Sequence, residues 1–383
     1  MIIEPNEQQE LLLSTTRQFL AKEVPLSRVR ELGGTDLGFD RGWWKQAAEL
    51  GWTSFLVDET QGGLAEDGFD LVNLVLIAAE MGRLVAPGPL VPVNVVAAAL
   101  SRGGTDDQRK EHLPGLVAGE KFAAWCVAEP GNPFGSAGVR LKATRAMGKI
   151  VLDGVKSPIE AAPFADLFLV TARLPNGSLI QVLVPADAPG IQINELDNLD
   201  LVRRFGEVVF RDVTVSVDAE VPHESVDDEL RRQLEIAAIL HCAEMTGAAD
   251  RAFEFTLEYL FDRFSFGRSL ASYQALKHRA ADMLMRLEAC KATVEAAARA
   301  CQEQQESSSM LASVAKSWVG DAAPEIVQEC VQLNGGIAVT WEHDVHIYLR
   351  RVTVDRNVHG TPADHRERIA SYLLQPRKLV EAS

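Results

Sequence analysis

A set of residues in the last third of the chain has the types and spacing to hold a nucleotide diphosphate. Arg263 is a permanent cation whose planar guanidinium suits a pyrophosphate. Gly267 allows a turn where the backbone can approach a phosphate closely. Taken alone, Arg263 would be expected to form a surface ion pair with Asp262 or Glu258. The set comprises Arg263, Phe266, Gly267, Gln274, Gln332, Gly335 and Gly336.

The composition restricts the partners of such a site. The chain has 383 residues, of which 47% are hydrophobic, and its formal net charge is -16. So acidic a protein repels nucleic acid and anionic membranes, and a polyanionic ligand must therefore meet a local basic pocket. Residues 1–5 do not begin a secretory signal, and the apolar run 71–79 is too short to span a bilayer. The five cysteines lack metal-type spacing, and we expect buried thiols in a cytoplasmic protein.

Three regions that differ in hydrophobic periodicity predict the elements that position these residues. Helical periodicity runs over about residues 7–119 and returns after about residue 228, with helices expected at 69–83, 273–304 and 309–333. Between them, short β-rich runs at 149–154, 166–171, 179–184 and 207–213 are separated by turn residues. We therefore predict an α+β protein with an N-terminal α-helical domain (1–120), a middle antiparallel β domain (121–227) and a C-terminal helical domain (228–383). This order excludes a doubly wound parallel sheet.

Several motifs, in order along the chain, resemble those of the acyl-CoA dehydrogenase family. The N-terminal matches are short turns and helix ends, whereas the matches after residue 260 are more specific because several occur together within about a hundred residues. They are the segments 58–63, 79–83 and 104–108, then Arg263–Gly267 with Tyr273, Gln274 and His278, then 332–336, Arg350, Gly360 and Thr361.

The resemblance implies a fold, a cofactor and partners. It implies that the C-terminal domain is a four-helix bundle and that the protein uses FAD to oxidise acyl-CoA thioesters. It also implies a dimer or tetramer, homo- or hetero-oligomeric, with electron-transfer flavoprotein as the electron acceptor. The diphosphate-type set, together with Thr361, is implied to bind FAD, and most of it reaches across to a neighbouring subunit's cofactor.

The positions where the family carries its catalytic base are altered. The reaction needs a base, normally a carboxylate, beside the α-carbon of the thioester. The family's Glu-Gly-Thr motif is matched here by His359-Gly360-Thr361, and the alternative base position, on the first long C-terminal helix, falls on Ala237. Glu235 and Glu244 lie nearby, but we interpret both as helix-surface residues or structural ion pairs.

The segments that would surround a flavin ring also depart from the family pattern. Glu129-Pro130-Gly131 matches the start of the family's flavin loop, but the Gly-Ser-Asp that should follow is missing, and Pro133 removes a backbone donor. The family's Trp-Ile-Thr is replaced by Pro158-Ile159-Glu160. Pro158 provides no aromatic wall, and Glu160 adds a negative charge where reduced flavin is also anionic.

Three hypotheses follow from this pattern. In the first, the chain is a subunit of an acyl-CoA dehydrogenase in which a sister chain supplies the base and the ring pocket. In the second, the chain is a self-sufficient dehydrogenase with His359 as its base, although His359 is equally compatible with a buried structural role. In the third, it binds acyl-CoA without redox chemistry. Residues 342–346 contain metal-ligand types, but no thiolate or second cluster accompanies them, and we expect no metal site.

Overall fold

The computed structural model describes residues 5–65 and 70–374 of the chain. Its first part is helical, and the side chains of Asn6, Asp40, Asp70 and Thr105 cap helix N-termini there. The helices are α1 (Glu7–Glu23), α2 (Leu26–Gly33), α3 (Arg41–Glu49), α4 (Leu71–Arg83), α5 (Leu90–Gly103) and α6 (Asp106–Val117).

A twisted sheet follows, in the order β1-β4-β2-β3-β7-β6 with β5 paired to the other side of β4. Most neighbouring strands are antiparallel, as predicted, but β4 pairs parallel with β1 and, through one residue pair, with β2. The chain forms the β2–β3 hairpin between β1 and β4 and re-enters the sheet in the same direction as β1, which the strand runs alone could not reveal. The strands are β1 (Ala123–Cys126), β2 (Lys142–Ala146), β3 (Lys149–Glu160), β4 (Leu167–Arg173), β5 (Leu179–Pro185), β6 (Ile191–Leu196) and β7 (Phe205–Ser216).

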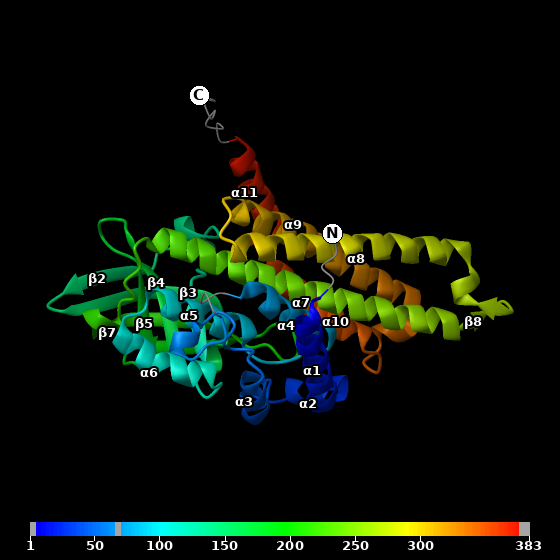
Figure 1. Ribbon diagram of the computed structural model, residues 1–383, viewed down its shortest axis with the longest axis horizontal. Coiled ribbons are helices and arrows are strands. Elements are labelled where there is room, and N and C mark those ends of the chain that lie inside the picture. The colour runs from blue at the N-terminus through cyan, green and yellow to red at the C-terminus, as the bar shows by residue number, and fades with distance from the viewer. Residues whose placement is uncertain (1–4, 66–69, 375–383) are drawn as a thin grey trace.

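The C-terminal part is a bundle in which α7, α8, α9 and α10 pack against one another, with α11 against α9. Helix α7 has 37 residues and is therefore about 55 Å long. It runs from the sheet to a two-stranded hairpin at the opposite end of the molecule (Figure 1). The elements are α7 (Val226–Asp262), β8 (Phe264–Ser265), β9 (Arg268–Ser269), α8 (Gln274–Gln302), α9 (Ser308–Asn334), α10 (Val345–Asn357) and α11 (Pro362–Leu374).

This architecture confirms the predicted fold class. The helices expected at 69–83, 273–304 and 309–333 are α4, α8 and α9, with bounds within two residues where they can be compared; Phe69 lies outside the described residues. Strands β1, β2 and β6 were not predicted, because they are short or poorly alternating. The five cysteines are buried thiols, and none of the described helices is long and apolar enough to cross a membrane.

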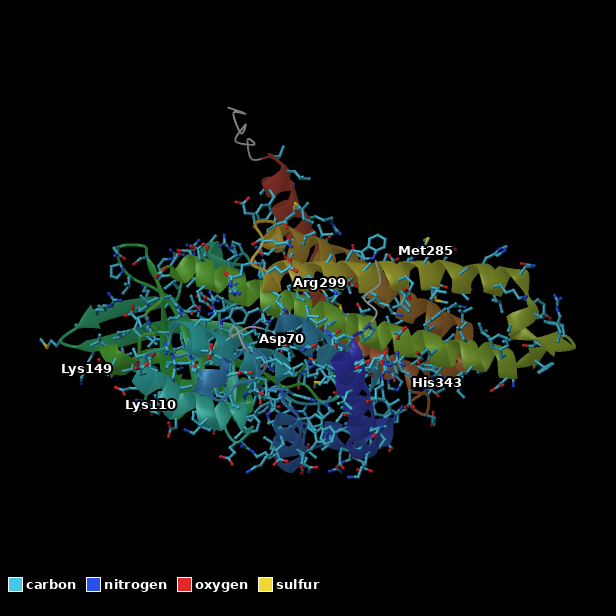
Figure 2. The ribbon with its side chains drawn as sticks, viewed as in Figure 1. Asp70, Lys110, Lys149, Met285, Arg299 and His343 are labelled. Atoms are coloured by element: carbon cyan, nitrogen blue, oxygen red, sulfur yellow. The ribbon has the colours of Figure 1, made fainter. Side chains whose placement is uncertain are left out.

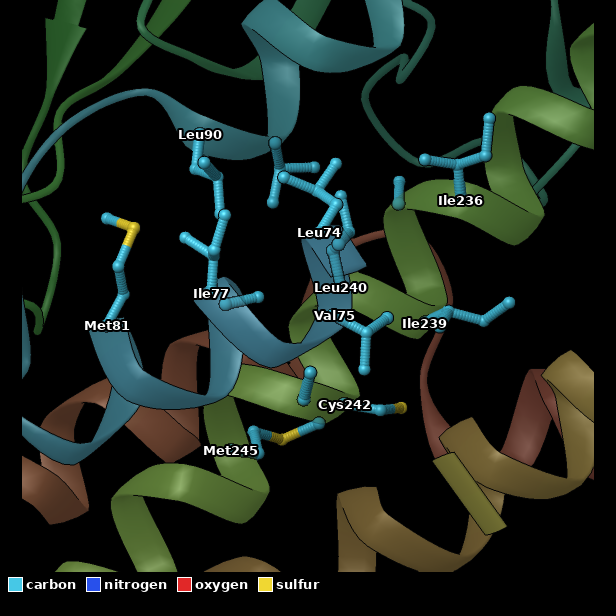
Figure 3. Packing of buried hydrophobic residues seen from close by; sticks show 14 of the residues in the cluster. Leu74, Val75, Ile77, Met81, Leu90, Ile236, Ile239, Leu240, Cys242 and Met245 are labelled. Carbon is cyan, nitrogen blue, oxygen red and sulfur yellow. The ribbon is translucent and has the colours of Figure 1, made fainter. Parts of the chain in front are cut away.

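The core is centred on the crossing of α4 with α7. Apolar side chains from the two helices face each other, among them Leu74, Ile77 and Leu240 (Figure 3). Two glycines let the backbones touch: a Cβ at Gly82 would lie 2.0 Å from the Glu244 carbonyl oxygen, and one at Gly247 would lie 1.9 Å from that of Ala79. The close crossing therefore depends on the absence of these two Cβ atoms.

We predict that Gly247→Ala lowers the free energy of unfolding by about 1–3 kcal/mol, because the added methyl group forces α4 and α7 apart. Gly115→Ala is the control: it also lies in a helix, but its new Cβ would meet only the flexible side chain of Lys121. Urea unfolding of both variants tests this. Equal stability of the Gly247 variant and the wild type would show that the crossing is not so tightly packed.

Candidate functional site

The diphosphate-type residues lie at the end of the bundle farthest from the sheet. The β8–β9 hairpin joins α7 to α8 and carries Phe266 and Gly267 at its turn, both with positive φ. The side chain of Phe266 is 97% exposed, and Arg263 is exposed at the base of the hairpin. The hydroxyl of Tyr273 donates to the carbonyl oxygen of Ser265 at 2.8 Å and fixes the hairpin against the start of α8.

The remaining members of this set are exposed at the same end of the bundle. Gln274 is the first residue of α8, and Gln332 is in the last turn of α9, before Gly335 and Gly336. The end of α9 is held against α7 because Asn334 Nδ2 donates to Thr256 Oγ1 at 2.9 Å. Among the described residues, no atom other than those of the adjoining residues lies within 4 Å of where a Cβ would stand on either glycine, so the turn is open to a ligand. We refer to Arg263, Phe266, Gly267, Gln274, Gln332, Gly335 and Gly336 together as the tip.

His359 lies elsewhere, at a cavity of about 250 Å³ between the sheet and the bundle. Its backbone has a φ of 55°, and its ring lies between the rings of Trp125 and His241, with centroid distances of 5.2 and 5.3 Å. Burial, and then the neighbouring charges of His241 and Lys316, hold the pKa of His359 well below its usual value. Proton uptake by this ring is therefore unfavourable, which weakens the hypothesis that His359 is the base.

The cavity is lined by the altered segments found in the sequence. Pro158 and Glu160 at the end of β3, the loop after Glu129, and Thr361 all contribute to its wall. The Thr361 hydroxyl donates to Asp364 Oδ2 at 2.7 Å, and its amide donates to the same oxygen at 2.8 Å, so this side chain begins α11. Thr361 therefore lies at the cavity and not at the tip.

Glu129 is held by the protein itself. Its carboxylate accepts from the amides of Arg140 and Leu141 at 2.9 Å and from Lys156 Nζ at 2.7 Å. Pro130 and Gly131 follow, and Gly131 has a φ of 69° with open space around it. The carboxylate thus fixes the shape of the loop.

Behind the cavity lies a buried network of charges that the sequence did not reveal. Arg203 donates to Asp355 Oδ1 at 2.8 Å and to Glu244 Oε2, and its side chain is 3% exposed. The network also includes Asp200 paired with Arg351, and Lys316, whose ammonium group donates to the backbone of Asp355. The interpretation of Glu244 as a structural ion pair fits this geometry, although the residue is buried and not on the helix surface.

Ala237 and Ala238 are buried in α7, and Glu235 is buried as well, with its carboxylate accepting from Ser308 at 3.0 Å and from Ser309. These hydroxyls therefore bond to Glu235, and Ser307, the residue before α9, makes no side-chain cap bond. Glu235 joins α7 to the start of α9.

His241, Glu244 and Asp355 have ligand atoms close enough together to suggest a metal site. The guanidinium of Arg203 already bonds to both carboxylates and lies 3.2 Å from His241 Nδ1. A cation in that position occupies the place a metal would need. In the segment 342–346, Asp344 pairs with Arg30 at 2.8 Å and His346 stacks on Trp341.

Comparison with known families decides the assignment. Family models of the N-terminal and C-terminal domains of acyl-CoA dehydrogenases match residues 6–120 and 229–374, which together make up more than half of the chain. This chain belongs to the acyl-CoA dehydrogenase family. Its homologues are oxidoreductases that act on CH–CH bonds, and FAD is the cofactor of the family.

Individual relatives resemble the chain along nearly its whole length. Acyl-CoA dehydrogenase IpdE2 of Mycolicibacterium smegmatis is 27% identical over 95% of this chain and 98% of its own. Butyryl-CoA dehydrogenase of Megasphaera elsdenii is 25% identical, with a TM-score of 0.89 over 98% of this chain and all of its own. The Tcur3481–Tcur3483 steroid ACAD is 27% identical, with a TM-score of 0.85 over 96% and 98%.

The tip and the cavity differ in how well their residues suit FAD. At the tip, exposed Arg263 and the open Gly335–Gly336 turn suit the diphosphate half. At the cavity, Pro158 replaces an aromatic wall, and the carboxylate of Glu160 would face a ring that becomes anionic on reduction. The residues of the cavity therefore do not fit the flavin ring.

We predict that the buried network makes the fold sensitive to acid. Although burial by itself raises the pKa of Glu244, Arg203 and then His241 outweigh it and lower the pKa to about 2. A lowered carboxyl pKa contributes stability above its unfolded value near 4.5, and that stability is lost as the pH falls toward 2. The wild type should lose about 3 kcal/mol through this group over that range.

Urea unfolding at pH 7, 5 and 3 measures the part of this loss, about 2 kcal/mol, that occurs above pH 3. Glu244→Gln should be less stable at pH 7 and should show a smaller loss on acidification. Glu111→Gln, an exposed carboxylate on α6, should keep the wild-type pH dependence. If the Glu244 variant also kept it, the network would not be the source of the acid sensitivity.

Proposed function

We propose that this chain is a subunit of an FAD-dependent acyl-CoA dehydrogenase and that its tip helps to hold the FAD of a partner chain. The enzyme would remove hydrogen from the α- and β-carbons of an acyl-CoA thioester and pass electrons to an electron-transfer flavoprotein. The observation that carries the proposal is a contrast between two sites: the tip keeps its diphosphate-type residues, whereas the segments of the flavin ring and both family base positions, His359 and Ala237, are altered.

The exposed apolar side chains support an assembly with another chain. Large apolar residues are exposed on α8, on α9 and around the tip, and Figure 2 shows Met285 on the outer face of α8. Such a concentration of exposed apolar surface is typical of protein interfaces. The group comprises Phe261, Phe264, Phe266, Leu284, Met285, Trp318, Ile337, Val339 and Trp341.

A sister acyl-CoA dehydrogenase chain is the partner that the altered cavity favours. A partner with its own ring pocket and a carboxylate at the family's base position would complete the site, and this chain would supply the cation for the diphosphate. The similar steroid ACAD is named as Tcur3481 together with Tcur3483, and this similarity supports an assembly of two different chains. A homo-oligomer with His359 as base remains the competing function, but the low pKa of His359 counts against it.

The proposal predicts that the chain purified alone carries little flavin and does not oxidise acyl-CoA in a dye-linked assay, because its own cavity cannot hold the ring. Co-expression with the sister chain should give a flavin-bearing complex that does. Full FAD occupancy with turnover in the isolated chain would contradict the proposal. A complex that binds acyl-CoA but contains no FAD would support the redox-free alternative.

A second prediction concerns the tip itself. Arg263→Ala should weaken FAD binding by the complex about 10- to 100-fold, because a charge-assisted hydrogen bond contributes about 1.5–3 kcal/mol. Arg211→Ala removes the same charge from an exposed position on β7, at the other end of the molecule, and should leave FAD binding unchanged. Ultrafiltration of each complex, followed by flavin fluorescence of the filtrate, measures the affinity. Equal FAD affinities of the Arg263 and Arg211 variants would show that Arg263 at the tip does not bind the cofactor.

A further inference from the structure

Two buried polar atoms at the cavity lack hydrogen-bond partners within the described part of the chain. They are Oε2 of Glu160 and Nε1 of Trp125, and both residues line the cavity. Trp125 is 3% exposed and Glu160 is 9% exposed. Other buried indoles, such as those of Trp43 and Trp44, also lack a partner among the described residues, but Glu160 and Trp125 line a cavity, where one ligand can supply both an acceptor and a donor.

The surroundings of Glu160 leave its carboxylate free for such a ligand. The nearest cations are Arg203, whose Nε lies 3.7 Å from Oε1, and His241, whose Nε2 lies 4.0 Å from Oε2. Both distances exceed that of a hydrogen bond. The other guanidinium nitrogens of Arg203 are already bonded to Glu244 and Asp355. Glu160 therefore lies near positive charge, but neither cation forms a hydrogen bond with its carboxylate.

We propose that Glu160 is the acid–base residue of this chain's own cavity, where it exchanges the α-proton of an acyl thioester whose carbonyl oxygen accepts from the Trp125 indole N–H. The thioester as ligand class rests on the proposed function. The assignment of Glu160 does not require the chain to hold a flavin.

The exchange step balances without an oxidant. The Glu160 carboxylate takes the α-proton, and the C–H electron pair becomes the enolate, whose negative charge on oxygen faces the Trp125 N–H. Glu160 then exchanges its proton with solvent and returns a solvent-derived proton to the same carbon. The thioester is regenerated, with no net transfer of electrons and with one hydrogen replaced.

The charges around Glu160 suit proton uptake. Burial is the largest effect and raises the pKa of Glu160, Arg203 and His241 oppose it, and Glu244 and Asp355 add to the rise. These groups come from α7, α10 and the turn before β7, and His359, stacked on His241, completes the surroundings. A carboxylate with a raised pKa is a stronger base, whereas the pKa of His359 is lowered.

His241 acts through Glu160 and not on the thioester, so we assign it as a positioning residue that sets the pKa of Glu160. Its Nδ1 lies 3.4 Å from Glu244 Oε2 and 3.6 Å from Asp355 Oδ1. Although burial lowers the pKa of His241, its contacts with Asp355 and Glu244 outweigh burial and raise it. When His241 is protonated, its positive charge lowers the pKa of Glu160 and favours the carboxylate form that acts as a base.

The test is deuterium incorporation at the α-carbon in D2O, followed by mass spectrometry of the thioester. The probes are butyryl-CoA, isobutyryl-CoA and octanoyl-CoA, incubated with the full chain as purified and without added FAD or partner. The wild type should exchange at least one of them, with a rate that rises with pH as Glu160 ionises. Lack of exchange of all three would overturn the proposal.

Glu160→Gln keeps the size of the side chain and should slow exchange about 100-fold or more, the usual contribution of a general base. Asp153→Asn is the control, because it removes an exposed carboxylate from the same strand, β3, and should leave the rate unchanged. Thermal unfolding confirms that both variants are folded. If the Glu160 variant were folded and exchanged at the wild-type rate, while His359→Gln did not, the base would be His359.

His241→Gln separates positioning from structure. Loss of its positive charge should shift the pH profile of exchange to higher pH, a change that a merely structural residue would not cause. An unshifted profile would show that His241 does not set the pKa of Glu160. If the His241 variant does not fold, the Glu160 and Asp153 variants decide the proposal. Exchange needs neither FAD nor partner, so its failure is distinct from a failure of the FAD-bridging function.

Discussion

The buried guanidinium of Arg203 is the interaction on which the arrangement of the domains depends. A charge removed from water is tolerated only when it is paired and hydrogen-bonded, and Arg203 finds its partners on other elements. Glu244 lies on α7 and Asp355 on α10, whereas Arg203 itself precedes β7. Satisfying this one cation therefore fixes the sheet against the bundle.

The same network shapes the cavity. Glu160 and His241 are near Arg203 because their elements are held there, and His359 is stacked behind them with Trp125 on its other face. The cavity has apolar lining that includes Trp125, Phe134 and Phe205, but it also presents the carboxylate of Glu160 to any ring placed there. Helix α7 leads from His241, beside the cavity, to Arg263 at the tip, which lies 22 residues further on and therefore about 33 Å along the helix axis.

Motifs with local physical causes could be predicted from the sequence. Helices α4, α8 and α9 follow from periodicity, and the tip residues could be picked out because they match motifs of the acyl-CoA dehydrogenase family. The substitution of His359, Pro158 and Glu160 was also visible, because each occupies a position where the family pattern sets an expectation.

The buried network and the sheet topology could not be predicted in this way. Arg203 belongs to no motif, and its partners follow it by 41 and 152 positions, so only the folded chain brings them together. Glu244 looked like a surface or paired residue because spacing says nothing about which face of a 37-residue helix is covered at each turn. The parallel pairing of β1 with β4 depends on the intervening hairpin and has no local signal.

The central claim is that this chain holds part of an FAD whose ring lies in another chain. A cryo-electron microscopy structure of the flavin-loaded assembly tests it most directly. The account predicts FAD diphosphate against Arg263 and Gln332, with the isoalloxazine ring in the partner's pocket and none between Pro158 and His359. A flavin ring seated in this chain's own cavity would contradict it.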